Sequence, residues 1–384
     1  MKHFCICLFA TLLARQLSAQ ASFQITYTGF TATQQVAFDL AAQRWAAILQ
    51  STVPIKVNAL LLPLPSSLLG ICFPNGRKDF AAAPFSDTWY PTALANAMSG
   101  NELNEGEFDM DIYLNSNQSW NWDTTGSVPP HQYDFVSVAM HELGHGLGFV
   151  SLAKVSNGEG SLGLLTPGDF SPLTTSFPWP DLDSLPSIYD RFLVDQDGQY
   201  LTELKNPSFA LGQKLTSNSL YFAGLQATAA NGNSAPRLYA PVTFALGSSI
   251  THLNESTYPA GHPDELMTPF VSKGKKVNSI GPVTWAMLAD LGWKLNPLQG
   301  IQAELTNAGL LIFPTLTHGP LWLHAPYRLN ELMLVNVHGQ VMLRQPAVRQ
   351  EEPLMLDLSA LPAGCYLLVV RSEDGQWAGR VAKQ

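Results

Sequence analysis

Charged residues are scarce in this sequence. They make up 13% of its 384 residues, about half of the roughly 25% that is usual for soluble globular proteins. Acidic residues outnumber basic ones, the formal net charge is -9, and no cluster of Lys and Arg stands out. The sequence therefore argues against a nucleic-acid-binding surface. Few charges together with 29 glycines and 27 prolines are typical of an extracellular protein that is rich in loops.

Long apolar runs are also missing, apart from one short run near the N-terminus. Lys2 and His3 form a basic start, Phe4–Ala14 is apolar, and Leu17-Ser18-Ala19 has the small residues of a signal cleavage site. This run is too short to span a bilayer, and no later segment is long enough. We predict that residues 1–19 are a signal peptide, that there is no transmembrane segment, and that the protein is secreted or held at the cell surface.

Cysteine is the third scarce residue. The sequence has four, and Cys5 and Cys7 lie within the predicted signal peptide, so the mature chain keeps only Cys72 and Cys365. These two fall in different predicted domains, which makes a disulfide between them a poor expectation. We therefore expect two unpaired thiols and a fold that disulfides do not organise.

What the sequence does contain is an HExxH pattern, His141-Glu142-Leu143-Gly144-His145. On an α-helix, residues four apart lie on the same face, so both imidazoles can reach one metal ion. Glu142 then projects beside the metal, where its carboxylate can take a proton from a bound water. Helical periodicity supports this interpretation, because apolar residues recur at three- and four-residue spacing on a separate face: Val136, Ala139, Met140, Leu143 and Leu147.

The other patterns predict an α+β fold in a chain long enough for two or three domains. Upstream of the histidines we expect strands at 23–30, 54–62 and 108–115. We also expect a helix from about Thr33 to Leu49, with a core face of Phe38, Ala41, Trp45 and Ile48. Residues 150–250 carry few regular signals and are predicted to be an irregular insertion. A last helix is predicted at Pro282–Leu291.

The motif extends to His141-Glu142-x-x-His145-x-x-Gly148, which resembles the metzincin clan of zinc endopeptidases. The resemblance implies a catalytic domain over residues 20–296, with a twisted sheet, an active-site helix and Zn²⁺ as the cofactor. It implies Glu142 as general base and a protein or peptide as substrate. It also implies a methionine turn below the metal, for which Met267 in the sequence ELMTP is the candidate. In that family the substrate pairs with a sheet edge, and the strand at 108–115 is the expected edge.

The third metal ligand departs from the clan's usual pattern. A His or Asp is expected at position 151, where this chain has Ser151, a poor zinc ligand. The leishmanolysin-like branch places its third histidine far downstream, shortly before an ELM-type methionine turn. His252 matches that arrangement, so the resemblance favours His141, His145 and His252 as the ligands. His262 is the alternative third ligand.

Several functions fit this pattern. The leading hypothesis is a secreted zinc metalloendopeptidase. One alternative is a non-catalytic surface or binding protein that retains the fold. Ser151 favours it, because without a third ligand the two histidines would bind zinc weakly. Another is a zinc hydrolase that acts on a non-peptide bond. A gluzincin-type site would take a glutamate as its third ligand, and Glu159 and Glu203 are the available candidates, although neither lies in a convincing helix.

The C-terminal part has a different sequence pattern, which predicts short strands joined by tight turns. After a linker at 297–307, we predict a small all-β sandwich over residues 308–384, with strands at 332–337, 341–343, 354–358, 365–371 and 377–382. The run LSALPAGCY at 358–366 and the terminal Lys383 resemble the type IX secretion sorting domain of Bacteroidetes. The resemblance implies the type IX secretion machinery as partner and export across the outer membrane.

Overall fold

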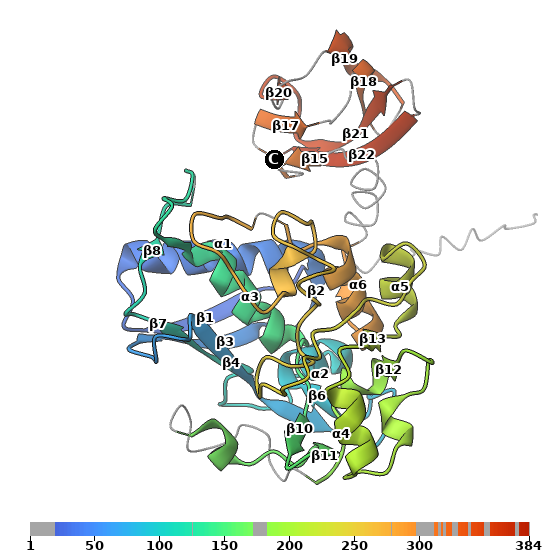
Figure 1. Ribbon diagram of the computed structural model, residues 1–384. Helices are drawn as coiled ribbons and strands as arrows, with labels where there is room; N and C mark the ends of the chain where they lie inside the picture. The colour runs from blue at the N-terminus through green and yellow to red at the C-terminus, as the bar shows by residue number, and fades with distance from the viewer. Residues whose placement is uncertain are drawn as a thin grey trace, which may run out of the picture.

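The computed structural model describes residues 20–124, 126–171, 183–277 and 279–296, and, in the C-terminal part, 311–313, 316–317, 320–324, 329–336, 339–348, 354–372 and 376–383. The predicted signal peptide (1–19) and linker (297–307) lie outside the described residues. The described chain is a mixed α+β protein, as the sequence predicts (Figure 1). Its described residues form three hydrophobic clusters: a large one within residues 21–293, a small one of Trp89, Leu152 and Leu165, and a separate one within residues 321–381.

A four-stranded sheet organises the N-terminal core. Its order is β1 (Phe23–Thr28), β3 (Ile55–Leu62), β7 (Met110–Asn115) and β4 (Gly70–Pro74). The first three strands run parallel, and β4 pairs antiparallel with β7. Predicting β7 as the sheet edge was wrong, because β3 and β4 flank it on both sides. The edge next to β7 is β4, a strand without clear alternation that the sequence did not reveal, and β1 forms the other edge.

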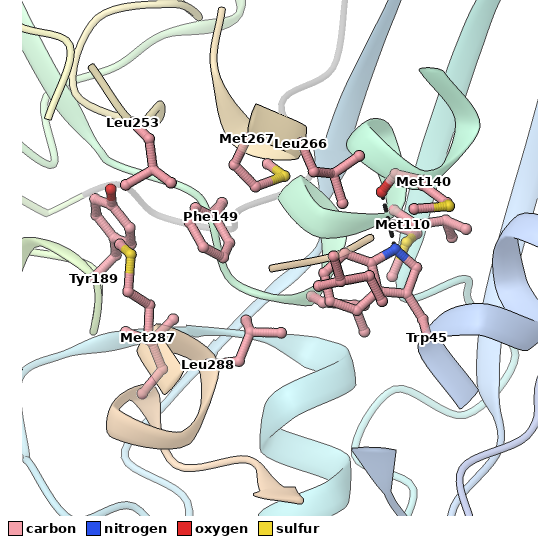
Figure 2. Close-up of a cluster of buried hydrophobic side chains, with 14 of the residues drawn as sticks. Trp45, Met110, Met140, Phe149, Tyr189, Leu253, Leu266, Met267, Met287 and Leu288 are labelled. Carbon is pink, nitrogen blue, oxygen red and sulfur yellow. Dashed lines mark hydrogen bonds between the residues drawn. The ribbon is translucent and has the colours of Figure 1, made fainter. Parts of the chain in front are cut away.

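Two helices, α1 (Ala32–Ile48) and α3 (Phe135–Leu147), lie side by side over this sheet (Figure 1). The N-cap of α1 is Thr31, two residues before the expected Thr33, because Thr31 and Gln34 form a reciprocal capping box. Its predicted core face is buried. The Trp45 indole donates a hydrogen bond to the Met140 carbonyl at 2.9 Å, which ties α1 to α3 (Figure 2).

The region 150–250 is more regular than the sequence suggests. It holds a hairpin of β10 (Ala153–Ser156) and β11 (Glu159–Leu162), a pair of β12 (Leu193–Asp195) and β13 (Leu220–Phe222), and the short helices α4 (Phe209–Leu215) and α5 (Leu225–Ala230). Among the described residues of this region, three 3-10 turns lie between them, at Pro167–Phe170, Asp190–Phe192 and Leu201–Glu203. Most of its described buried apolar side chains belong to the same core as the sheet and α3, and Leu152 and Leu165 pack with Trp89 in a smaller cluster. The region is therefore part of the domain and not an appendage.

The remaining elements of this part are short. They are β2 (Leu49–Gln50), β5 (Gly76–Lys78), β6 (Trp89–Pro91), α2 (Thr92–Ser99), β8 (Trp120–Asn121), β9 (Tyr133–Asp134), η4 (Glu265–Met267), α6 (Pro282–Leu291) and β14 (Lys294–Leu295). Helix α6 has the predicted bounds. The Asp264 carboxylate accepts a hydrogen bond from the Val283 amide at its start, at 2.7 Å, so α6 is anchored to the turn η4.

The C-terminal residues form two sheets. One is β15 (Leu311–Phe313), β17 (Pro320–His324) and β20 (Leu354–Asp357); the other is β16 (Leu316–Thr317), β22 (Gln376–Lys383), β21 (Gly364–Arg371), β18 (Leu329–Asn336) and β19 (Val341–Val348). Buried side chains from both sheets share one core, including Leu323, Leu356, Leu334 and Leu368. Each predicted strand overlaps an observed one, β18 to β22, although β19 runs five residues beyond its predicted end at 343.

Two absences bear on the predictions. Within the described ranges, no helix is both long and apolar enough to cross a membrane. Cys72 and Cys365 are unpaired, as expected, with Cys72 partly buried and Cys365 exposed.

Candidate metal centre

Helix α3 carries the two histidines of the HExxH pattern. Asp134 caps its start by accepting a hydrogen bond from the Ser137 amide at 3.0 Å. The helix ends at Leu147, and Gly148 adopts a φ of 155°, a conformation that side-chain-bearing residues rarely take. The chain therefore leaves the helix three residues after the second histidine.

Three imidazoles converge at this helix. The Nε2 atom of His252 lies 3.0 Å from Nε2 of His141 and 3.2 Å from Nε2 of His145. The two helix histidines are themselves 3.1 Å apart at Nε2. Among the described residues, this trio is the group of His, Cys, Asp or Glu side chains that could hold a metal ion. His252 comes from a loop more than 100 residues away in sequence, at a separation of 107 from His145.

The other ring nitrogen of each histidine faces a backbone carbonyl. Nδ1 lies 2.7 Å from the Leu266 oxygen in His141, 2.7 Å from the Phe149 oxygen in His145 and 2.7 Å from the Ser248 oxygen in His252. A carbonyl only accepts hydrogen bonds, so each Nδ1 must carry the proton. Each Nε2 is then a bare lone pair, and three lone pairs pointing at one another repel unless a cation lies between them.

The trio fits a divalent metal ion. Tetrahedral Zn²⁺ with nitrogen ligands at about 2.0–2.1 Å places those nitrogens about 3.3 Å apart, close to the 3.0–3.2 Å observed. Burial lowers the pKa of His141, lowers that of His145 to about 3, and holds that of His252 well below its usual value. The imidazoles are thus kept neutral, which is the form that binds metals.

Glu142 follows His141 on α3 and lines the same cleft as the three imidazoles. Its residue is only 5% exposed, and burial raises the pKa of its carboxyl to about 8. A cation at the trio would favour the ionised form and draw this pKa back down. Once ionised, this carboxylate could accept a proton from a group bound in the same cleft.

The sequence matches no protein-family model and no curated protein. The geometry of the centre therefore carries the functional argument by itself.

Gly70, the first residue of the edge strand β4, is a site residue that the sequence did not reveal. A Cβ atom at this position would lie 2.7 Å from Oε1 of Glu142. The carboxylate therefore fits against β4 only because residue 70 has no side chain. No sequence pattern marks this glycine, since its role depends on β4 and α3 meeting in the fold.

We expect Gly70→Ala to lower the rate of the reaction at this centre about tenfold or more, because the added methyl displaces the Glu142 carboxylate. Zinc affinity should stay unchanged, since the three histidines do not contact Gly70. The control is Gly168→Ala, where the nearest atom to the new methyl is 3.7 Å away. Turnover and zinc affinity, measured together, check this prediction; a drop in affinity instead of turnover would contradict it.

The turn η4 holds two of the three ligands. Its Leu266 carbonyl faces Nδ1 of His141, and its Met267 carbonyl accepts a hydrogen bond from the amide of Leu253, the residue after His252, at 2.7 Å. The Met267 side chain is fully buried beneath the helix, where its sulfur would lie 2.6 Å from a Cβ added at Gly144 (Figure 2). The predicted role of Met267 as a structural support fits this position.

The alternative ligands lie elsewhere. His262 is separate from the trio, and its Nδ1 accepts a hydrogen bond from the Asp264 amide at 3.1 Å. Ser151 donates a hydrogen bond to the Asp190 carboxylate at 2.5 Å. Glu159 in β11 and Glu203 in the 3-10 turn Leu201–Glu203 are not part of the trio either. The structure thus brings together His141, His145 and His252, and leaves out the candidates that the sequence kept open.

The trio opens into a cleft of about 440 Å³. Its walls come from β4, from the face of α3 that carries His141 and Glu142, from the loop that carries His252, and from the segment 268–277 that follows Met267. Both His141 and Glu142 face this space. A ligand in the cleft can therefore touch the metal-binding nitrogens, the Glu142 carboxylate and the sheet edge at the same time.

Proposed function

We propose that this protein is a secreted zinc endopeptidase of the metzincin type, with His141, His145 and His252 as metal ligands and Glu142 as general base. The observation that carries the proposal is the convergence of three deprotonated Nε2 atoms beside a buried carboxylate in an open cleft. Three histidines and one open position are the ligand set of catalytic zinc.

The chemistry divides between the metal and the chain. When bound, zinc supplies a Lewis acid that acidifies a water and polarises a carbonyl. Glu142 accepts the proton of the attacking water and then delivers it to the leaving amine. The carbonyls of Leu266, Phe149 and Ser248 keep the three imidazoles in the tautomer that leaves Nε2 free.

A peptide fits the cleft better than a compact substrate does. Strand β4 ends the sheet and lines the cleft along its length, from Gly70 next to Glu142 to Pro74. The free backbone groups of an edge strand can pair with an extended chain, which fixes a peptide bond near the reacting groups. Substrate pairing is therefore proposed for β4, in place of β7.

Export is the second part of the proposal. The signal-like start at residues 1–19 and the C-terminal run LSALPAGCY at 358–366 support secretion through the type IX machinery. The two C-terminal sheets, with a core of their own, are consistent with a separate sorting module. Residues 308–384 can be fused to a reporter protein in a cell that has this machinery. We expect the fusion to appear outside the outer membrane, and retention inside the cell would contradict the sorting role.

Incubation of the full chain with a peptide mixture tests the catalytic part. We expect the zinc-loaded protein to cut internal peptide bonds, cutting to stop after chelation, and added zinc to restore it. A folded, zinc-loaded protein that cuts no peptide would overturn the endopeptidase proposal, and a screen of ester and amide substrates would then follow.

A further inference from the structure

The metal centre is built from two segments far apart in sequence, and the structure shows what joins them. Helix α3 brings His141 and His145, whereas His252 arrives on an irregular loop. Such a loop does not by itself hold an imidazole to within a few tenths of an ångström, as a metal site requires. Two adjacent residues of the 150–250 region, Tyr189 and Asp190, reach both segments.

Asp190 binds the segment that follows α3, at Ser151 and Leu152. Its Oδ1 accepts a hydrogen bond from the Ser151 hydroxyl at 2.5 Å, and its Oδ2 accepts from the Leu152 amide at 3.0 Å. Asp190 is fully buried, so these donors replace the water that its carboxylate lacks. Ser151, at the position where the clan's usual third ligand stands, is thus used to fix Asp190.

Tyr189 binds the loop that carries His252, at Ile250. Its hydroxyl donates a hydrogen bond to the Ile250 carbonyl at 3.0 Å, two residues before His252. The ring is fully buried and packs against Phe149, with ring centroids 5.9 Å apart (Figure 2). It also packs against Phe222, at 5.3 Å between centroids. Phe149 is the residue whose carbonyl orients His145. One side chain therefore contacts the surroundings of two metal ligands.

Ile250 is held in a strained conformation. Its φ is 77°, in the left-handed region that β-branched residues avoid. Its amide donates to the Tyr239 carbonyl at 2.8 Å and its carbonyl accepts from Tyr189, so both of its peptide groups are fixed. Strain of this kind persists only where the surroundings impose it, and it gathers at functional sites.

We propose that Tyr189 and Asp190 form a clamp that positions His252 against the helix histidines, and that Ile250 is the strained residue through which the clamp acts. Tyr189 and Ile250 are positioning residues, since neither reaches the metal-binding nitrogens. This inference rests on the proposed metal centre and does not depend on the substrate.

Tyr189→Phe tests the clamp in the full chain, with zinc affinity measured by competition against a chelator. We expect zinc affinity to fall about tenfold, the lower end of what loss of a ligand-orienting contact brings about. Tyr90→Phe is the matched control, because Tyr90 is equally buried but its hydroxyl contacts the backbone of Phe85. The metal-free melting temperatures of the two variants should be similar. A zinc affinity for Tyr189→Phe within twofold of the parent would overturn the clamp.

Ile250→Gly and Ile250→Ala separate strain from packing. Both remove the buried side chain, but glycine accepts a positive φ and alanine does not. We expect the glycine variant to keep the higher zinc affinity and the higher melting temperature, and the reverse order would show that the left-handed conformation does not position His252.

A parent that binds no zinc would remove the metal centre and with it the proposed function. A parent that binds zinc but cuts no peptide would leave the clamp standing.

Discussion

Glu142→Gln is expected to lower the rate of peptide cleavage by about 10²–10⁴-fold, the range that a general base contributes. Glutamine has the shape of glutamate, so it fits the same space against Gly70. It cannot accept a proton from the attacking water, and that is the step for which Glu142 is proposed. Zinc affinity should stay within about twofold of the parent's, because the three Nε2 atoms and their carbonyl partners do not involve this carboxylate.

Peptide turnover and zinc content of the purified variant, measured side by side, check this result. The matched control is Glu159→Gln, an exposed residue of the β10–β11 hairpin, which should turn over like the parent. If the Glu142 variant kept more than a tenth of the parental rate with full zinc loading, Glu142 would not be the base. If it lost its zinc, the test would report on the metal and the side chain would have a structural role as well.

Local sequence patterns predicted much of this fold. The histidine spacing and the separate apolar face lie on one helix and need no information from elsewhere in the chain. The same holds for α1, whose buried face follows from its helical period, and for the C-terminal strands, which are short and bounded by tight turns. Such elements are encoded by neighbours within a few residues of each other.

Features that depend on contacts between distant segments were missed or mistaken. Strand β4 has no alternation, and it becomes a strand because it pairs with β7. Without β4, the strand β7 looked like the edge. The role of Gly70 follows from the meeting of β4 with α3, and the clamp formed by Tyr189 and Asp190 follows from the packing of the 150–250 region. No periodicity in the sequence carries these contacts.

The third ligand, His252, was predicted neither from a local pattern nor from a contact between distant segments. His252 was singled out by its likeness to a downstream histidine before an ELM turn, and not by any local pattern. What makes the choice physically definite is the turn η4, which holds His141 through one carbonyl and the neighbour of His252 through the next. Loop positions of this kind are set by tertiary hydrogen bonds, which a sequence does not display.

His252→Ala should therefore lower zinc affinity by more than about 100-fold, since loss of a direct ligand exceeds the 10–100-fold effect of losing an outer contact. Two imidazoles would remain, where catalytic zinc sites usually have three protein ligands. Peptide cleavage should fall to background at zinc concentrations that saturate the parent. Competition with a chelator, followed by cleavage assays at matched zinc occupancy, separates the loss of metal from the loss of rate.

His262→Ala is the control that decides between the two candidates for third ligand. The His262 side chain is 37% exposed, and its Nδ1 accepts a hydrogen bond only from the nearby Asp264 amide among the contacts described for this residue. Its removal should leave zinc affinity and turnover within about twofold of the parent's, as is usual for a surface substitution. A large loss of zinc from His262→Ala, with His252→Ala still loaded, would mean that the loop binds metal in a different arrangement. The clamp at Tyr189 would then act on a residue that does not hold the metal.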